Sequence, residues 1–164
     1  MTAPRADGGL ADHTARLRQD FDRAFAEPVA RGGTPGDDFL AIRLRGDAHA
    51  LRLADVARLL RLRQLTRYAA GAPGWLGLHG VAGGVVPVYD LGVLLGRAPG
   101  DAAPGWMAVC AGAPVALAFD AFDGQFRHAD EPGQDLLRLP GGVRPVIPVA
   151  RLLESIRSLC AQET

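Results

Sequence analysis

Residues 76–96 read Leu-Gly-Leu-His-Gly-Val-Ala-Gly-Gly-Val-Val-Pro-Val-Tyr-Asp-Leu-Gly-Val-Leu-Leu-Gly. Two short apolar runs, Leu76–Val81 and Val85–Tyr89, flank a glycine pair at 83–84, and such runs bounded by glycine are typical of buried strands. We expect the glycine pair to supply the positive φ angles of a tight hairpin. Because Pro87 has no N–H to donate, its strand should lie at a sheet edge or leave that side unpaired.

A short helix is predicted directly after the hairpin. Asp90 stands where an N-cap residue belongs, and Leu91, Leu94 and Leu95 share one helical face. Gly96 then occupies the C′ position, where a left-handed backbone is common. The stretch therefore predicts a hairpin followed by about one turn of helix.

This order of residues resembles the hallmark of the CheW family, the adaptor proteins of bacterial chemotaxis signalling. The family pattern is a strand, an Asn-Leu-Arg-Gly turn, the strand Val-Val-Pro-Val-x-Asp-Leu and a short helix. Here the turn reads Gly80-Val81-Ala82-Gly83 and the strand reads Val85-Val86-Pro87-Val88-Tyr89-Asp90-Leu91. The resemblance covers about Asp38 to Leu153. It implies a mainly β fold of two SH3-like antiparallel β-barrel subdomains with short helices, flanked by N-terminal and C-terminal helices.

Composition narrows the possible functions. Of the 164 residues, 48% are hydrophobic and 22% charged, which favours one folded domain. Eighteen basic residues balance eighteen acidic ones, so no overall field attracts nucleic acid or anionic lipid. All the basic residues are arginine, which excludes a P-loop lysine and a Schiff-base lysine. With no signal peptide and no membrane-length apolar run in view, we expect a cytoplasmic protein without membrane insertion.

The first 37 residues are expected to form an extension. An amphipathic helix is predicted at about 10–26, followed by a linker rich in Pro and Gly. Its apolar face either docks on the protein's own domain or binds a partner's groove, with Leu17, Phe21 and Phe25 as anchors. A CheW-like domain then spans residues 38–161.

Short elements follow one another along this domain. We predict strands at 39–44, 49–53, 61–68, 106–111, 114–120, 136–139 and 143–147, with helices at 54–60 and 149–161. The hairpin at 106–120 weakly echoes the one at 39–53, which fits two similar small barrels in tandem. The Pro/Gly-rich segment 97–105 is the expected boundary between the two subdomains.

A search for catalytic groups finds no convincing site. The only group of possible metal ligands is His128-Ala129-Asp130-Glu131, and it precedes Pro132 without a second group to complete the coordination. A solvated turn is therefore preferred over a metal site. Cys110 and Cys160 are fifty residues apart without a C-x-x-C motif, which favours reduced thiols over a disulfide or a metal site. No enzyme activity, metal or cofactor is predicted.

Arginines accumulate in the first part of the domain, at Arg43, Arg45, Arg52, Arg58, Arg61, Arg63 and Arg67. Proteins that read single-stranded RNA place aromatic side chains among their basic residues. No aromatic residue lies between Phe39 and Tyr68, so a solvated face or the rim of a protein-docking surface is preferred.

The resemblance implies a non-catalytic adaptor. Its partners would be the cytoplasmic tip of a methyl-accepting chemoreceptor and the regulatory domain of a CheA-type histidine kinase, with no nucleic acid bound. One alternative is a divergent CheW-fold interaction protein for a dedicated pathway, such as pilus motility, that does not bind standard receptors. A remote alternative is a small metal-dependent hydrolase that uses His128, Asp130 and Glu131.

The resemblance also suggests the residues of a partner interface, which are Val56, Arg58, Leu59, Ala82, Pro87 and Asp90. Aligned without gaps from Phe39 to Leu91, the family's Val-x-Glu-Ile falls on Val56-Ala57-Arg58-Leu59. The family's Glu is therefore Arg58 in this chain, and the Arg of its turn is Ala82. This loss of two charged positions favours a divergent adaptor with a different receptor contact.

Overall fold

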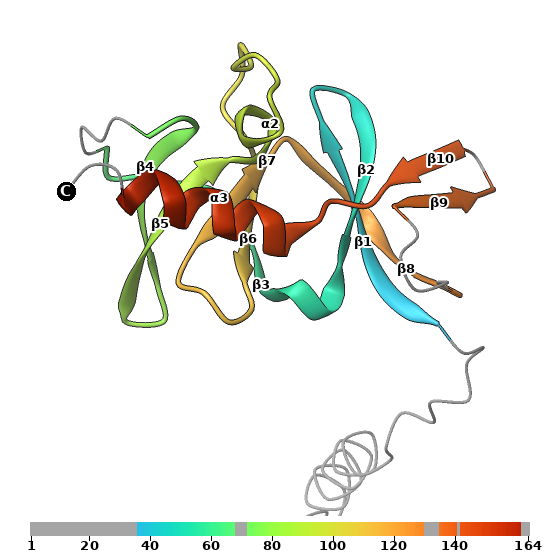
Figure 1. Ribbon diagram of the computed structural model, residues 1–164. Helices are drawn as coiled ribbons and strands as arrows, with labels where there is room; N and C mark the ends of the chain where they lie inside the picture. The colour runs from blue at the N-terminus through green and yellow to red at the C-terminus, as the bar shows by residue number, and fades with distance from the viewer. Residues whose placement is uncertain (1–35, 68–71, 130–134, 141, 162–164) are drawn as a thin grey trace, which may run out of the picture. The chain divides into compact units, whose positions relative to one another are not determined.

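The computed structural model describes residues 36–67, 72–129, 135–140 and 142–161 (Figure 1). The chain divides into two compact units, Met1–Pro35 and Gly36–Thr164, and every described residue belongs to the second. The helix predicted at about 10–26, with Leu17, Phe21 and Phe25, lies outside the described residues.

One group of strands combines the first two strands of the second unit with its last three. β1 (Asp37–Leu44) pairs antiparallel with β2 (Asp47–Arg52) and with β8 (Ala121–His128). β9 (Leu136–Leu139) and β10 (Gly142–Pro145) form a hairpin. A parallel bridge between Ala50 and Val146 links this hairpin to β2, and the N–H of Ile147 donates to the Ala50 carbonyl at 2.9 Å.

The second group is one five-stranded sheet in the order β3-β6-β7-β5-β4. Its strands are β3 (Val56–Arg61), β4 (Trp75–Val81), β5 (Gly84–Asp90), β6 (Trp106–Cys110) and β7 (Ala116–Phe119). Residues 62–67 continue from β3 and reach β4, where Thr66 and Leu78 exchange two backbone hydrogen bonds of 2.9 Å. The two ends of the sheet are thereby joined, as expected for an SH3-like subdomain.

Gly77 permits this closure. A Cβ at this position would lie 2.6 Å from the Thr66 carbonyl oxygen, and the residue has φ of +141°. Both the close approach of two backbones and this dihedral angle require glycine.

The chain passes between the two strand groups twice. It leaves β2 through the 3₁₀ turn η1 (Leu53–Asp55) to enter β3, and it returns from β7 to β8 through Asp120. Residues 97–105 therefore connect α2 (Leu91–Leu94) to β6 on the way from one strand of the five-stranded sheet to another. The strand groups are not divided at 97–105, in contrast to the boundary expected from the sequence. The echo between the hairpins at 39–53 and 106–120 reflects similar local elements, and local patterns do not report long-range pairing.

The helix predicted at 54–60 is wrong, because residues from Val56 onward form β3. A β-bulge between Val56 and Arg58 breaks the alternation of the strand. Val56 and Leu59 consequently pack against one hydrophobic cluster, whereas Leu60 packs against another. The bulge gives Val56 and Leu59 the three-residue spacing that resembles a helical face.

β8 is a strand without a predicted counterpart, since no element was expected at 121–128. Its half-buried residues alternate with exposed polar ones from Phe122 to His128, which is the period of a strand with one face covered. Ion pairs fasten it to β1: Arg127 pairs with Asp38 at 2.9 Å, and Arg43 pairs with Asp123 at 3.0 Å.

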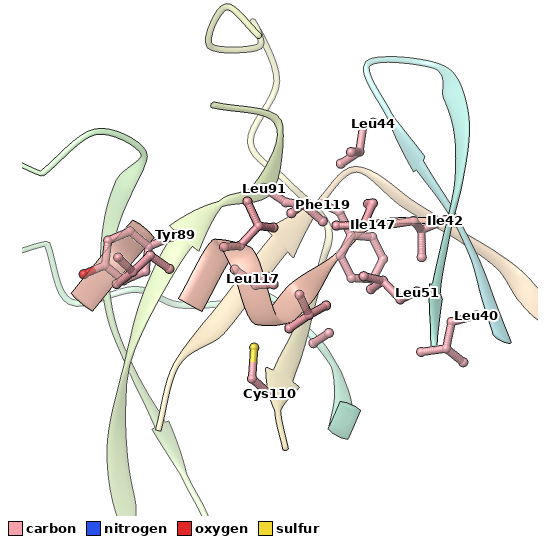
Figure 2. Packing of buried hydrophobic residues seen from close by; sticks show 14 residues of the cluster. Leu40, Ile42, Leu44, Leu51, Tyr89, Leu91, Cys110, Leu117, Phe119 and Ile147 are labelled. Carbon is pink, nitrogen blue, oxygen red and sulfur yellow. The ribbon is translucent and has the colours of Figure 1, made fainter. Parts of the chain in front are cut away.

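A shared core joins the strand groups. Its buried residues are Leu40, Ile42, Leu44, Leu51, Tyr89, Leu91, Ala108, Cys110, Leu117, Phe119, Ile147, Val149, Leu152 and Ile156 (Figure 2). They come from β1 and β2, from one face of the five-stranded sheet, from α2, from α3 (Val149–Ala161), the predicted C-terminal helix, and from Ile147 ahead of that helix. The opposite face of that sheet buries a second cluster that includes Val88 and Met107. Because both faces are covered, all four residues of β7 are buried.

Candidate partner interface

Three of the predicted interface residues lie on β3, an end strand of the five-stranded sheet that pairs with β6. Val56 and Leu59 are half-buried and pack against the shared core, whereas Arg58 is exposed. Among the described residues, Arg58 forms no ion pair. β3 thus presents small apolar side chains beside an exposed cation.

Ala82 and Pro87 lie on the β4–β5 hairpin. The turn residues are Ala82 and Gly83, with φ of +48° and +82°, so the positive φ angles fall one position earlier than the predicted glycine pair. Val85, two residues before Pro87, is 62% exposed. Pro87 pairs with Leu78 of β4, and pairing with β7 starts only at Val88. Pro87 is therefore tolerated although β5 is not at the edge of the sheet, because no residue of β7 pairs with it.

The carboxylate of Asp90 is used within the protein. It is 6% exposed. Its Oδ1 accepts the N–H of Val93 at 3.1 Å, which confirms the predicted N-cap of α2. Its Oδ2 accepts a hydrogen bond of 2.8 Å from the Arg45 guanidinium. Gly96 has φ of +79° at the end of the helix, as expected for its C′ position.

Arg45 and Asp120 complete a cluster that local sequence patterns do not reveal. Arg45 lies in the β1–β2 turn with φ of +54°. Its guanidinium binds Asp120 at 2.9 Å, and its backbone N–H donates to the same carboxylate. The hydrogen bond to Asp90, opposed by burial, raises the pKa of Arg45 above its ordinary value. The cluster ties the β1–β2 turn to α2 and to the end of β7.

The six predicted interface residues come from different elements. Val56, Arg58 and Leu59 lie on β3, whereas Ala82 and Pro87 lie on the β4–β5 hairpin. Asp90 supports α2 from within. The surfaces of β3 and of the hairpin therefore remain as candidates for partner contact.

Possible metal ligands are not brought together in the part of the chain that the structure describes. No group of three His, Cys, Asp or Glu side chains lies close enough to hold a metal ion there. His128 sits on β8 opposite Asp37, while Asp130 and Glu131 lie outside the described residues. Burial, followed by the nearby Asp55 carboxylate, raises the pKa of the Cys110 thiol to about 12, so this thiol stays protonated at neutral pH. Among the described helices, none is long and apolar enough to cross a membrane.

Comparison with known proteins agrees with this architecture. The family model of the CheW-like domain matches residues 38–158. The structure is similar to that of the scaffolding protein TtCheW from Thermoanaerobacter tengcongensis, with a TM-score of 0.63 and 15% sequence identity over 73% of this chain and 94% of that one. A search of curated proteins finds no match. With the family model spanning most of the chain and the strand groups arranged as in that scaffold, the chain belongs to the family of CheW-like domain proteins.

Proposed function

We propose that this protein is a non-catalytic adaptor that couples the cytoplasmic tip of a chemoreceptor to the regulatory domain of a CheA-type histidine kinase. The observation that carries the proposal is the shared core. Because residues from both strand groups and α3 pack in one buried cluster, surfaces on different strands keep a fixed relative geometry. An adaptor without a reaction of its own needs this property, since a signal must pass between two partners as a change in their arrangement.

The two candidate surfaces have the character of protein contacts. β3 offers the half-buried Val56 and Leu59 beside Arg58, and the β4–β5 hairpin offers the exposed Val85 beside Pro87. Small apolar anchors with a polar rim are typical of interfaces between separately folded proteins. Family membership supports the same role, because the related structure is that of a scaffolding protein.

Titration calorimetry against the regulatory domain of the CheA-type kinase from the same organism tests this function. We expect a dissociation constant of about 1–10 μM, in the range of transient signalling contacts. Deleting residues 1–37 should leave it unchanged if the strand surfaces carry the contact. Affinity that disappears with the deletion would move the site to Leu17, Phe21 and Phe25. A protein that binds in neither form would contradict the proposal.

A matched pair of variants locates the kinase contact. Val85→Asp should weaken kinase binding about tenfold, because it places a charge among the apolar contacts of the hairpin. Leu136→Asp is the control, since Leu136 is also exposed, at 54%, but lies on β9 in the other strand group. Equal losses in both variants would argue against a contact at the hairpin.

The charge at Arg58 favours a second candidate function, that of a divergent adaptor for a dedicated pathway such as pilus motility. Both Arg58 and Ala82 are exposed, so they can be changed without disturbing the core. Arg58→Glu combined with Ala82→Arg should strengthen binding to an ordinary chemoreceptor tip about tenfold, by restoring the family's two charges at those positions. Arg151→Gln on the exposed side of α3 controls for the net charge, since both variants make it more negative by one. Unchanged binding would mean that these positions do not set the choice of receptor.

A further inference from the structure

Four arginines follow one another along the end of the five-stranded sheet. They are Arg58 and Arg61 on β3 and Arg63 and Arg67 on the segment that continues from it. All four are exposed, and none forms an ion pair within the described residues. Arg61 is partly engaged, since its guanidinium lies 4.0 Å from the centre of the Trp106 ring. The strip therefore carries positive charge that the described part of the chain does not neutralise.

Most of the other arginines in the described part of the domain behave differently. Six of them pair with aspartates, and these are Arg43, Arg45, Arg52, Arg97, Arg127 and Arg144. Their charges are used to fasten neighbouring strands and turns. The charges beside β3 do not have this role, so they remain available to a partner.

A groove of about 1040 Å³ runs beside the basic strip. Two segments line it, residues 62–67 as the first wall and residues 99–104 as the opposite wall, and Trp75 and Leu76 add apolar surface. Arg63 and Arg67 both belong to the first wall. The groove lining thus combines apolar surface with two exposed arginines.

The opposite wall is held in place from inside the domain. The Nε of Arg45 donates to the Ala98 carbonyl at 3.4 Å. A Cβ at Gly100 would lie 2.8 Å from the guanidinium, so the loop packs closely on Arg45. Two acids line the groove, and Asp90, which is 6% exposed, pairs with Arg45 rather than with the arginines of the groove. Among the exposed side chains of the lining, Arg63 and Arg67 therefore outnumber Asp101.

The backbone of the first wall also offers hydrogen-bond donors. The N–H of Leu62 donates to Gly105 and the N–H of Thr66 donates to Leu78, at 3.1 and 2.9 Å. Within the described residues, the N–H groups of the three residues 63–65 between them have no acceptor. An extended segment with free donors is a template on which another extended chain can lie.

We propose that this groove binds an extended acidic segment of a partner protein. Carboxylates of the segment pair with Arg63 and Arg67, and its carbonyl groups accept from the N–H groups of Arg63 and Leu65, since alternate N–H groups of an extended chain face the same side. Side chains at alternate positions rest on Trp75 and Leu76, because successive residues of an extended chain point to opposite sides. This contact is additional to the proposed coupling of receptor and kinase and does not depend on it. A single-stranded nucleic acid fits less well, since Trp75 is the one aromatic residue in the described lining.

Fluorescence anisotropy with a labelled peptide of ten residues, in which Glu and Val alternate, tests the proposal directly. We expect the full-length protein to bind it at least about tenfold more tightly than the same peptide with Gln in place of Glu, because charge-assisted hydrogen bonds are lost in the neutral peptide. Raising NaCl from about 50 to about 200 mM should weaken the binding. In NMR spectra, the amide signals of residues 63–65 should shift on titration.

Two double variants with equal loss of charge provide the control. Arg63→Gln with Arg67→Gln should reduce peptide affinity about tenfold or more, whereas Arg151→Gln with Arg157→Gln on α3 should leave it nearly unchanged. Equal affinity for the Glu and Gln peptides, or equal losses in both double variants, would overturn the proposal. Tighter binding of a single-stranded RNA of ten nucleotides than of the acidic peptide would also overturn it. The kinase affinity measured by titration calorimetry should not change in the double variant Arg63→Gln with Arg67→Gln. This result would separate the groove from the proposed adaptor function.

Discussion

Replacing Phe119 with alanine is expected to lower the free energy of unfolding by about 4 kcal/mol. Phe119 is 1% exposed, and it belongs to the buried cluster that also holds Ile42 of β1 and Ile147 (Figure 2). Truncation would leave a cavity at the point where both strand groups meet α3. Urea denaturation followed by tryptophan fluorescence measures the loss, since Trp75 and Trp106 both lie in the five-stranded sheet.

Phe122→Ala is the matched control for this truncation. Phe122 is half-buried and contacts the Trp106 ring at 5.3 Å between centroids, so its removal should cost only about 1 kcal/mol. Because the core is shared, Phe119→Ala should also speed hydrogen exchange in β1 and in β6 together. Faster exchange confined to the five-stranded sheet would show that the strand groups unfold separately, contrary to the single body that the adaptor function needs.

Replacing Asp90 with alanine is expected to lower the free energy of unfolding by about 3 kcal/mol. Two losses add up: α2 loses its N-cap, worth about 1 kcal/mol, and the partly buried Arg45 loses the nearer of its two aspartates. Asp90→Asn should cost only about 1.5 kcal/mol, because asparagine is also a good N-cap and loses mainly the charge. The comparison separates the contribution of the cap from that of the ion pair.

The exposed ion pair of Asp47 and Arg97 serves as the control for Asp90. Its atoms approach to 2.6 Å, but the Asp47 side chain is 65% exposed, and exposed pairs contribute little to stability because solvent screens them. The urea midpoint should therefore be lowest for Asp90→Ala, higher for Asp90→Asn and highest for Asp47→Ala. A loss for Asp90→Ala no larger than that for Asp47→Ala would contradict a structural role for the Arg45 cluster.

Local patterns predicted the elements whose residues are close in sequence. The hairpin within 76–90, the capped turn of helix after it and the C-terminal helix from Val149 are all found in the structure. These elements depend on turn residues with positive φ angles, on an N-cap and on periodic apolar residues, which act over a few positions. The same stretch carried the family resemblance, and with it the mainly β fold.

Patterns failed where a strand departs from regular alternation or lacks strong hydrophobic residues. The bulge in β3 gave Val56 and Leu59 a helical spacing. β8 has no fully buried residue, and its pairing with β1 joins segments about 80 positions apart, as the contact of Arg43 with Asp123 shows. Register over such distances is set by tertiary pairing and not by local propensity.

By itself, the sequence determined the elements around residues 76–96, the family and the absence of lysine chemistry. Only the tertiary structure decided which charges are used internally and which remain available to partners. Arg45 meets Asp120 across 75 positions and Asp90 across 45, whereas Arg63 and Arg67 stay exposed beside a groove. Arginines that look alike in sequence acquire different roles because ion pairing depends on distances in space, and chain folding alone sets those distances.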